Sequence, residues 1–401
     1  MKIGIIKETK NPPDRRVAIT PEIAKAIKEH FSDVDIVVEP SDIRAITDDE
    51  YLQQGIDVSN NIDNSDILIG IKEVSIPTLR QGKKYMFFSH TGKKQSYNRP
   101  LLQKCAELKI TLIDYEYLTD ENHVRLIAFG RWAGIVGAYN TIWTYGQKYK
   151  LFDIKRAYQC YDHQEMFKEL EHIQLPPLRI VITGGGRVAH GAIETLSHLR
   201  IKEVSPQDYL TKQFSEAVYC RLDPWHYTKH KNNEIHDLQH FIDNPHEYEA
   251  NFLPFALKSD IYISCHFWDP RSPEFLKPED YLHPDFKISI IGDVSCDIKK
   301  PIASTLRASK IADPIYGYNP KTQLEDEPFK RGNITVMAID NLPAELPRSS
   351  SADFANAFYY KILPELLKGD DSKVIERATI LKNGKLTPRF EYLRDYLEGR
   401  E

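Results

Sequence analysis

Short apolar runs alternate with amphipathic segments along the first third of the chain. The runs are rich in Ile, Val, Leu and Tyr, which is typical of buried strands, and the segments between them have helical spacing. Strands that alternate with helices favour an α/β fold with a parallel sheet covered on both faces. The expected strands are Ile3–Lys7, Asp35–Val38, Asp66–Ile71, Tyr85–Ser89 and Thr111–Asp114, and the expected helices are Pro21–Phe31, Asp48–Gln54, Ile76–Arg80 and Tyr97–Leu108.

A second alternating unit follows a long helical segment, 127–149, and a Pro-rich linker, 174–177. Its first strand and helix are expected over 179–183 and 188–199. We expect two domains, residues 1–135 plus about 345–401 and residues 136–344, with a polar insertion at about 221–252. The remaining expected elements are the strands Asp260–Cys265, Ile288–Val294 and Ile334–Ile339 and an amphipathic helix, Ser351–Leu367, before a charged tail.

Composition excludes several classes of protein. Of 401 residues, 41% are hydrophobic and 28% are charged, which is ordinary for a globular chain, and a net charge of −5 does not favour nucleic acid or anionic membrane as a partner. No apolar run reaches the ~18 residues of a membrane span, and the N-terminus lacks the apolar stretch of a signal peptide. Five widely spaced cysteines without a C-x-x-C motif indicate a reduced, cytoplasmic protein.

A glycine-rich turn opens the second unit. Gly184, Gly186 and Ala189 fit the pattern G-x-G-x-x-[G/A] between an expected strand and an expected helix, which is the context of a dinucleotide-binding loop. An ordinary strand-to-helix turn is the alternative. NAD binding also needs a carboxylate at the tip of the second strand. We expect that strand at about Ile201–Val204, where no carboxylate stands at the tip, so NAD and NADP both remain open.

Charged side chains stand at the carboxyl ends of successive strands in the first unit, where ligands of open α/β sheets bind. Lys72, His90 with Lys93, and Glu116 follow three of these strands, and Arg16 lies in the loop after the first. A single charged strand end is usually a solvated one, but four together indicate a site. Nearby cations lower the pKa of a lysine, which can then transfer protons near neutral pH. An arginine can bind a substrate carboxylate.

Other charged residues carry weaker signals. Strand ends of the second unit have His266, Asp293 and Asp340, and a carboxylate there suits an oxidised nicotinamide, with helix capping as the alternative for Asp340. The insertion contains five histidines, of which His236 and His240 are four residues apart. Because no third ligand has convincing spacing, we expect a solvated surface and no metal site.

Several motifs together resemble a known family. Lys7-Glu8 and the segment 14–21 are similar to the start of the alanine dehydrogenase and transhydrogenase superfamily. Longer stretches resemble lysine–ketoglutarate reductase and the lysine-forming saccharopine dehydrogenases over nearly the whole chain. These stretches are Pro40-Ser41 with Arg44-Ala45-Ile46, Gly70–Glu73, Phe87–Thr91, Leu112–Glu116, Phe129–Gly134 and Ile339–Pro347.

The resemblance implies two Rossmann-like, doubly wound domains with an active site in an interdomain cleft. It implies an NAD(P)-dependent enzyme that interconverts saccharopine with lysine and 2-oxoglutarate. Lys72 and His90 match the catalytic acid and base, and Arg16, Lys93, Glu116 and Phe129 match substrate-side positions. The matching cofactor-side positions are Arg125, Gly184, Gly186, Arg187, Val188, Asp293, Ile339 and Asp340.

Some questions stay open at this point. The alternatives are an alanine-type amino-acid dehydrogenase and a catalytically silent NAD(P)-binding regulator. The sequence ends at Glu401, so we expect it to lack the second catalytic half of the bifunctional animal and plant enzymes. An oligomer is possible, and the direction of flux is undetermined.

Overall fold

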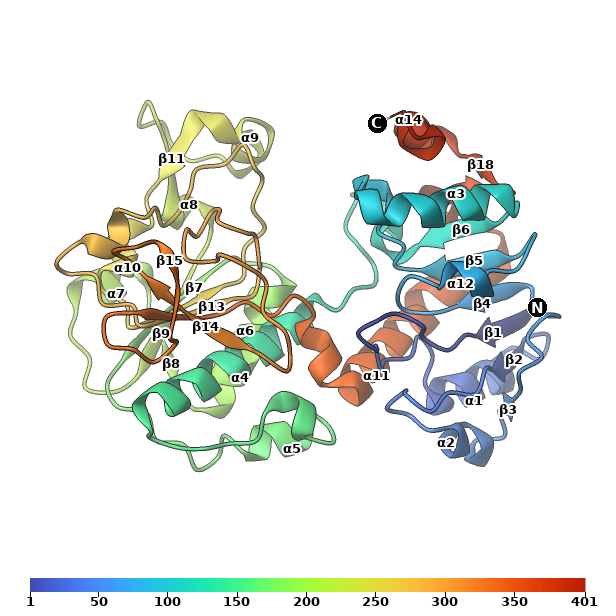
Figure 1. Ribbon diagram of the computed structural model, residues 1–401, viewed down its shortest axis with the longest axis horizontal. Helices are drawn as coiled ribbons and strands as arrows, with labels where there is room; N and C mark the ends of the chain where they lie inside the picture. The colour runs from blue at the N-terminus through green and yellow to red at the C-terminus, as the bar shows by residue number, and fades with distance from the viewer. Residues whose placement is uncertain (401) are drawn as a thin grey trace. The chain divides into compact units, whose positions relative to one another are not determined.

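A computed structural model describes residues 1–400 of the chain, which divide into two compact units (Figure 1). Unit 1 consists of residues 1–129 and 347–401, and unit 2 consists of residues 130–346. Within the described residues, no helix is long and apolar enough to cross a membrane.

Unit 1 is built on an eight-stranded sheet, and its strands from β3 to β6 run parallel, as the alternation of strands and helices predicts. Figure 1 shows the order β6, β5, β4, β1, β2, β3 within this sheet. Each of these strands has three or four residues except β3, and most of those residues are fully buried. The strands are β1 (Lys2–Ile5), β2 (Asp35–Val38), β3 (Asp57–Val58), β4 (Ile67–Ile69), β5 (Lys84–Phe87) and β6 (Thr111–Asp114).

The helices of unit 1 begin where their capping residues allow. Helix α1 starts with Pro21 after Thr20, as expected, because proline fits the first helical turn. The expected helix at 76–80 is a single 3₁₀ turn, Ile76–Thr78. The helices are α1 (Pro21–His30), α2 (Asp48–Gln53), α3 (Arg99–Glu107), α11 (Pro347–Ala357), α12 (Leu363–Lys368), α13 (Val374–Ala378) and α14 (Arg394–Glu398), and a π-helical turn, Phe358–Ile362, joins α11 to α12.

The charged tail expected after residue 367 is wrong as a description, because this segment completes the sheet. Strand β17 (Thr379–Lys382) pairs antiparallel with β6, and β18 (Lys385–Leu386) pairs with β17. Ile380 and Leu381 are fully buried beside the N-terminal strands. A mostly parallel sheet thus ends in an antiparallel edge, which is common in α/β proteins.

Unit 2 contains a second eight-stranded sheet, in the order β15-β14-β16-β13-β12-β7-β9-β8. The six strands from β16 to β8 in this order run parallel, while β14 and β15 form an antiparallel edge. The strands are β7 (Arg179–Thr183), β8 (Lys202–Glu203), β9 (Val218–Leu222), β12 (Ile261–Ser264), β13 (Ile290–Asp293), β14 (Ile315–Asn319), β15 (Leu324–Asp326) and β16 (Ile334–Met337).

The neighbour of β7 differs from the expected one. The strand expected at about 201–204 is β8, which has two residues and lies at the edge of the sheet, while β9 pairs with β7 along its full length. The insertion is also more ordered than its sequence indicates. Its strands β10 (Thr228–His230) and β11 (Tyr248–Ala250) form a hairpin, and helix α9 (Leu238–Asp243) lies in the connection between them.

Two helices of unit 2 pack with their backbones in contact. Helix α4 (Gly130–Tyr149) lies beside α6 (Arg187–His198) in Figure 1. A Cβ added at Gly134 would lie 1.8 Å from the carbonyl oxygen of Val188, so only glycine permits this approach. The expected linker, 174–177, is a loop inside unit 2. The other helices are α5 (His163–Lys168), α7 (Pro206–Thr211), α8 (Pro224–Tyr227) and α10 (Leu253–Ala256).

Candidate functional site

The parallel pairing of β1, β4, β5 and β6 brings their carboxyl ends to one edge of the unit 1 sheet. β4 pairs with β1 and with β5, and β5 pairs with β6, all in parallel. The residues after these strands therefore gather at this edge, as the sequence argument expects. Lys72, Glu73, His90 and Glu116 all follow strands that end there.

Lys72 is partly buried, close to the cations Arg16 and Lys10 and to the carboxylates of Asp14 and Glu73. Burial, followed by the nearby charges of Arg16 and Lys10, lowers the pKa of Lys72 to about 8. The carboxyl group of Glu8 accepts hydrogen bonds from the backbone N–H of Ile71, at 2.6 Å, and of Lys72, at 2.9 Å. Burial raises the pKa of Glu8 to about 8. Lys72 is therefore held by its backbone and can exchange a proton near neutral pH.

Glu73 links His90 to a second lysine. Its carboxylate lies 2.7 Å from Nδ1 of His90 and 2.8 Å from Nζ of Lys10. Burial opposes the charge of Glu73, but the hydrogen bonds from His90 and Lys10 lower its pKa to about 2. His90 has a left-handed backbone, with φ of 53°, which costs energy for a residue other than glycine. The anion fixes the orientation of the imidazole ring.

Arg16 is buried and already paired with a carboxylate of its own chain. Its Nε and one terminal nitrogen donate to Asp14 at 2.9 and 2.5 Å, and both side chains are about fully buried. The guanidinium also lies over the ring of Phe129, 4.2 Å from its centroid. Phe129 in turn stacks on Phe354 from α11. Arg16 thus acts on Lys72 as a fixed positive charge, and its pair with Asp14 occupies one edge of the guanidinium.

A second charged group surrounds Glu116. Lys93 and Arg125 contact its Oε1 at 2.9 and 3.2 Å. Burial disfavours the charge of Glu116, but these two cations lower its pKa. The side chains of Lys93 and Arg125 are 49% and 39% exposed, so these cations, unlike Arg16, are accessible to a ligand. Arg125 was matched to a cofactor-side position from sequence, and it lies here beside Glu116 in unit 1.

The glycine loop of unit 2 connects β7 to α6. Gly184 has φ of 112°, and a Cβ there would lie 2.6 Å from the carbonyl oxygen of Cys265, so the turn requires glycine. Gly186 is the N-cap of α6, and a Cβ added to it would meet no atom within 4 Å. The exposed backbone at Gly186 and the start of α6 at Arg187 and Val188 therefore fit a pyrophosphate.

Asp223 is a residue that the sequence argument missed. β9, not β8, lies beside β7, and Asp223 follows its last residue. The carboxylate lies over the glycine loop, because a Cβ at Gly185 would be 2.4 Å from Oδ1 of Asp223. Arg221 donates to the same oxygen at 2.5 Å. The buried run 218–222 followed by Asp-Pro was the available signal, but it lies farther along the chain than the usual spacing of about 20 residues.

The other residues expected at the cofactor have mixed surroundings. Asp293 is buried and accepts hydrogen bonds from Ser264, from Thr305 at 2.6 Å and from the N–H of Cys296 at 3.0 Å, so it holds the loop after β13. Ile339 is buried and Asp340 is exposed after β16. His266 is buried against the glycine turn, where its Nδ1 lies 2.8 Å from the hydroxyl of Thr183.

Comparison with known proteins places these observations in a family context. Residues 4–136 match the family described as "Alanine dehydrogenase/PNT, N-terminal domain". The chain is 26% identical to "Alpha-aminoadipic semialdehyde synthase, mitochondrial" of Mus musculus and 27% identical to the Arabidopsis thaliana protein of that type, with 100% and 98% of the chain aligned. It spans about half the length of these relatives, 48% and 41%.

A shorter relative and two solved structures align end to end. "Saccharopine dehydrogenase [NAD(+), L-lysine-forming]" of Emericella nidulans is 24% identical, with 96% of this chain and 97% of that protein covered. The structure of an L-alanine dehydrogenase matches with a TM-score of 0.66 at 14% identity, over 99% of this chain and 100% of that chain. A transhydrogenase from Sinorhizobium meliloti matches with a TM-score of 0.57 at 14% identity, over 96% and 99% of the two chains. The chain therefore has an alanine dehydrogenase-like α/β fold, matches the alanine dehydrogenase/PNT N-terminal domain over residues 4–136, and is similar in sequence to saccharopine dehydrogenases and alpha-aminoadipic semialdehyde synthases.

Proposed function

We propose that this chain is an NAD-dependent oxidoreductase that interconverts saccharopine with L-lysine and 2-oxoglutarate. The observation that carries the proposal is Lys72, which has a pKa of about 8 among Arg16 and Lys10, in the same strand-end cluster as the His90–Glu73 pair. The similarity to lysine-forming saccharopine dehydrogenases over most of the chain supports the choice of substrates. Five free thiols support a reducing compartment such as the cytoplasm.

The residues of unit 2 fit NAD. The backbone at Gly184 and Gly186 and the N-terminus of α6 suit the pyrophosphate, and Asp223 has the place and charge that suit a free ribose 2′-hydroxyl. The same carboxylate would repel a 2′-phosphate, so we favour NAD over NADP. The bound nicotinamide supplies the hydride acceptor in saccharopine oxidation and the hydride donor in the reverse reaction.

Lys72 and His90 divide the proton transfers between them. In the oxidative direction, Lys72 in its neutral form takes the proton of the secondary ammonium of saccharopine, so that the neutral amine can lose hydride. Its lowered pKa leaves a large neutral fraction near pH 8. His90, oriented by Glu73, then takes a proton from the water that attacks the imine carbon. The C–N bond of the resulting carbinolamine then breaks, its nitrogen takes up a proton, and its hydroxyl loses one. The products are lysine, with its free ε-amine, and 2-oxoglutarate, with its keto group.

The substrate carboxylates need cations with accessible N–H groups. Saccharopine has three carboxylates, and Lys93 and Arg125 are partly exposed beside Glu116. We propose these two as carboxylate ligands. Arg16 keeps its proposed substrate-side role as a fixed positive charge close to Lys72. The ring of Phe129 packs against the guanidinium of Arg16.

A substrate screen tests the proposal. Lysine plus 2-oxoglutarate is supplied with NADH or NADPH, in parallel with ammonia plus pyruvate, and loss of the reduced cofactor is followed by absorbance. We expect turnover with lysine, 2-oxoglutarate and NADH. Lys72→Met should abolish most of it, while Lys84→Met, at the start of β5 and so at the opposite edge of the sheet, should not. Turnover with ammonia and pyruvate alone, or NADH binding without any turnover, would reject the proposal in favour of an alanine-type dehydrogenase or a silent regulator.

A further inference from the structure

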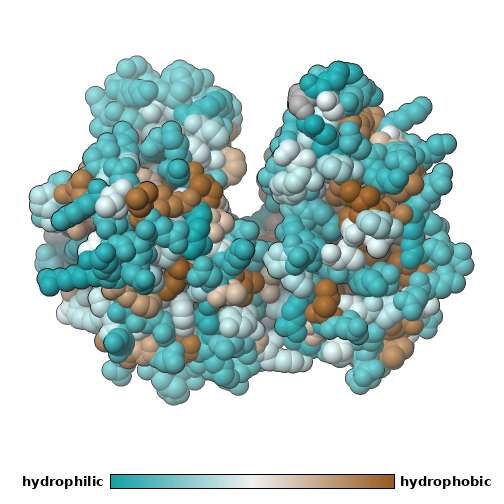
Figure 2. Space-filling view, in the orientation of Figure 1, coloured by the Kyte–Doolittle hydropathy of each residue, from teal (hydrophilic) through white to brown (hydrophobic). Residues whose placement is uncertain are grey.

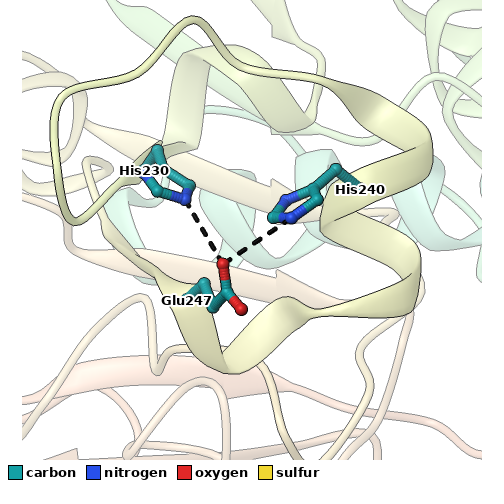
Figure 3. A group of neighbouring side chains, drawn as sticks. All are labelled: His230, His240 and Glu247. Carbon is teal, nitrogen blue, oxygen red and sulfur yellow. Dashed lines mark ion pairs between the residues drawn. The ribbon is translucent and has the colours of Figure 1, made fainter.

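Three metal-ligating side chains meet in the insertion of unit 2. His230 ends β10, His240 lies in α9, and Glu247 lies in the 3₁₀ turn Pro245–Glu247 before β11. Figure 3 shows both imidazole rings directed at one carboxylate oxygen of Glu247. One ligand atom from each residue lies within 4.8 Å of the others. The pair that sequence spacing singled out, His236 and His240, is not the pair that the fold brings to this point.

The distances in this cluster suit a shared ion better than direct hydrogen bonds. Nε2 of His230 and Nε2 of His240 lie 3.5 and 3.6 Å from Oε2 of Glu247. A hydrogen bond between such atoms would be about 2.7–3.2 Å long. Ligands about 2.0–2.2 Å from a tetrahedral Zn²⁺ are about 3.4 Å from one another. Two edges of such a tetrahedron are therefore already present, and the two imidazole nitrogens, which lie within 4.8 Å of each other, would approach to about 3.4 Å to form the third.

The hydrogen bonds around His240 leave its inner nitrogen with a lone pair. The hydroxyl of Tyr248 donates to the carbonyl oxygen of Asp237 at 3.2 Å, so its oxygen accepts from Nδ1 of His240, 3.1 Å away. A neutral imidazole that carries its proton on Nδ1 presents a bare Nε2 to the carboxylate. Two electron-rich atoms then face each other, which a cation between them relieves. An outer hydrogen bond of this kind is usual for metal-binding histidines.

His230 needs a small adjustment to bind in the same way. Its Nδ1 accepts a long hydrogen bond of 3.3 Å from the N–H of Asn232. An ion on Nε2 of a neutral imidazole puts the proton on Nδ1, so this contact would open. His246 is the other histidine nearby, and its Nε2 lies 3.9 Å from Oε1, the second oxygen of Glu247. The side chains of His240 and Glu247 are 41% and 44% exposed, which gives an ion a route from solvent.

The apolar contacts of the insertion are concentrated in the rings around Tyr248, and helix α9 adds no fully buried side chain to them. Helix α9 buries none of its six residues, and Ile235, Leu238 and Ile242 are exposed near or within it. In Figure 2, the part of unit 2 that carries α9 and β11 is mostly hydrophilic on the face shown. Small segments with too little core are commonly held together by a metal ion, whose binding energy then contributes to folding.

We propose that His230, His240 and Glu247 form a zinc site that fastens α9 to the β10–β11 hairpin. The ion has three protein ligands, and water completes its tetrahedron. The site lies in the insertion and uses none of the residues proposed for catalysis or for NAD binding. Its role is structural: it adds a link between three short elements whose rings also pack around Tyr248.

Zinc binding to the full, tag-free chain tests this proposal. After removal of metals with a chelator, Zn²⁺ is titrated by calorimetry, and Co²⁺ is added separately to record its visible spectrum. We expect one Zn²⁺ per chain, a tetrahedral Co²⁺ spectrum without a thiolate band, and slower proteolysis within residues 231–247 when Zn²⁺ is present. His240→Ala and Glu247→Gln should each weaken zinc binding at least about tenfold, the loss that even an outer-shell change can cause.

His246→Ala is the matched control, because it removes an exposed histidine of the same segment but none of the three ligands. It should keep zinc binding within a few-fold of the original chain. If zinc binding is unchanged in both ligand variants, or if His246→Ala weakens it equally, then dispersed surface histidines bind the zinc and this cluster does not. If the chain binds no zinc at all, the cluster is only a contact between two histidines and a carboxylate. Each of these results overturns the proposal, and none of them bears on the lysine and 2-oxoglutarate assay.

Discussion

Lys72 is the residue whose environment most directly decides the chemistry. Its ammonium is partly buried beside two other cations, and these together lower its pKa to about 8. As a base, Lys72 must be neutral, so saccharopine oxidation should rise with pH and level off above about 8. In the reductive direction, which forms saccharopine, Lys72 acts as an acid and must be charged. The reductive rate should therefore fall above the same pH. Measured pH–rate profiles in both directions check the two opposite trends.

Substitution of Lys72 separates proton transfer from charge. Lys72→Met should lower kcat by about 10²–10⁴-fold, the usual contribution of a general acid–base group, and remove the limb near pH 8. Lys72→Arg keeps a cation that does not titrate, so it should lose the same limb while substrate binding is preserved. A limb near pH 8 that persists in both variants would assign it to another group.

Asp223 decides the cofactor at the scale of one side chain. Its carboxylate lies over the glycine loop and pairs with Arg221 at 2.5 Å. Asp223→Ser removes the negative charge and leaves Arg221 able to meet a 2′-phosphate. We expect the KM for NADH to rise about tenfold, the equivalent of roughly 1.4 kcal/mol, while NADPH becomes a usable cofactor. Steady-state kinetics with both cofactors check this, and an unchanged preference would place the ribose elsewhere.

The pair α4 and α6 leaves no room for a side chain at two of its glycines. A Cβ at Gly134 would lie 1.8 Å from one backbone oxygen, and a Cβ at Gly191 would lie 2.0 Å from another. Gly134→Ala should therefore force the helices apart and cost about 1–3 kcal/mol, which lowers Tm by several degrees. Gly130→Ala is the control, because its Cβ would make an ordinary 3.5 Å contact. Thermal unfolding followed by circular dichroism compares the two.

Local patterns predict the bounds of a strand or helix well where its own residues determine which side chains are buried. β2 and β6 have the bounds that their apolar runs indicate, and Thr20-Pro21 marks the start of α1. Pairing between strands is not local, which is why β9 was overlooked as the neighbour of β7.

The same limit applies to the candidate site. The gathering of Lys72, His90 and Glu116 followed from parallel order alone. The partners Glu73 and Asp14 could not be assigned from sequence, because a single charged residue gives no sign of which side chain it will face. Likewise, the charged composition after residue 367 concealed the apolar pair at Ile380 and Leu381 that closes the sheet.

Unit 2 is formed by one continuous stretch of the chain, whereas unit 1 needs segments from both ends of the chain. Residues 130–346 contain the complete unit 2 sheet and its own apolar core. Unit 1 combines residues 1–129 with 347–401, and Phe354, Phe358 and Leu381 are part of its core. Removing the C-terminal segment thus exposes apolar residues of the N-terminal strands as well.

This difference predicts how fragments behave. The fragment 130–346 should unfold cooperatively and bind NADH, because the glycine loop, Asp223 and the supporting helices α4 and α6 all lie within it. The fragment 1–129 should not fold, because β6 loses its partner β17 and the core loses the side chains of α11. Co-expression of 347–401 with 1–129 should restore at least part of the structure, as the missing strand can pair again. Circular dichroism and NADH fluorescence measure both properties. A folded 1–129, or a folded 130–346 that does not bind NADH, would contradict the assignment of core and cofactor site to separate units.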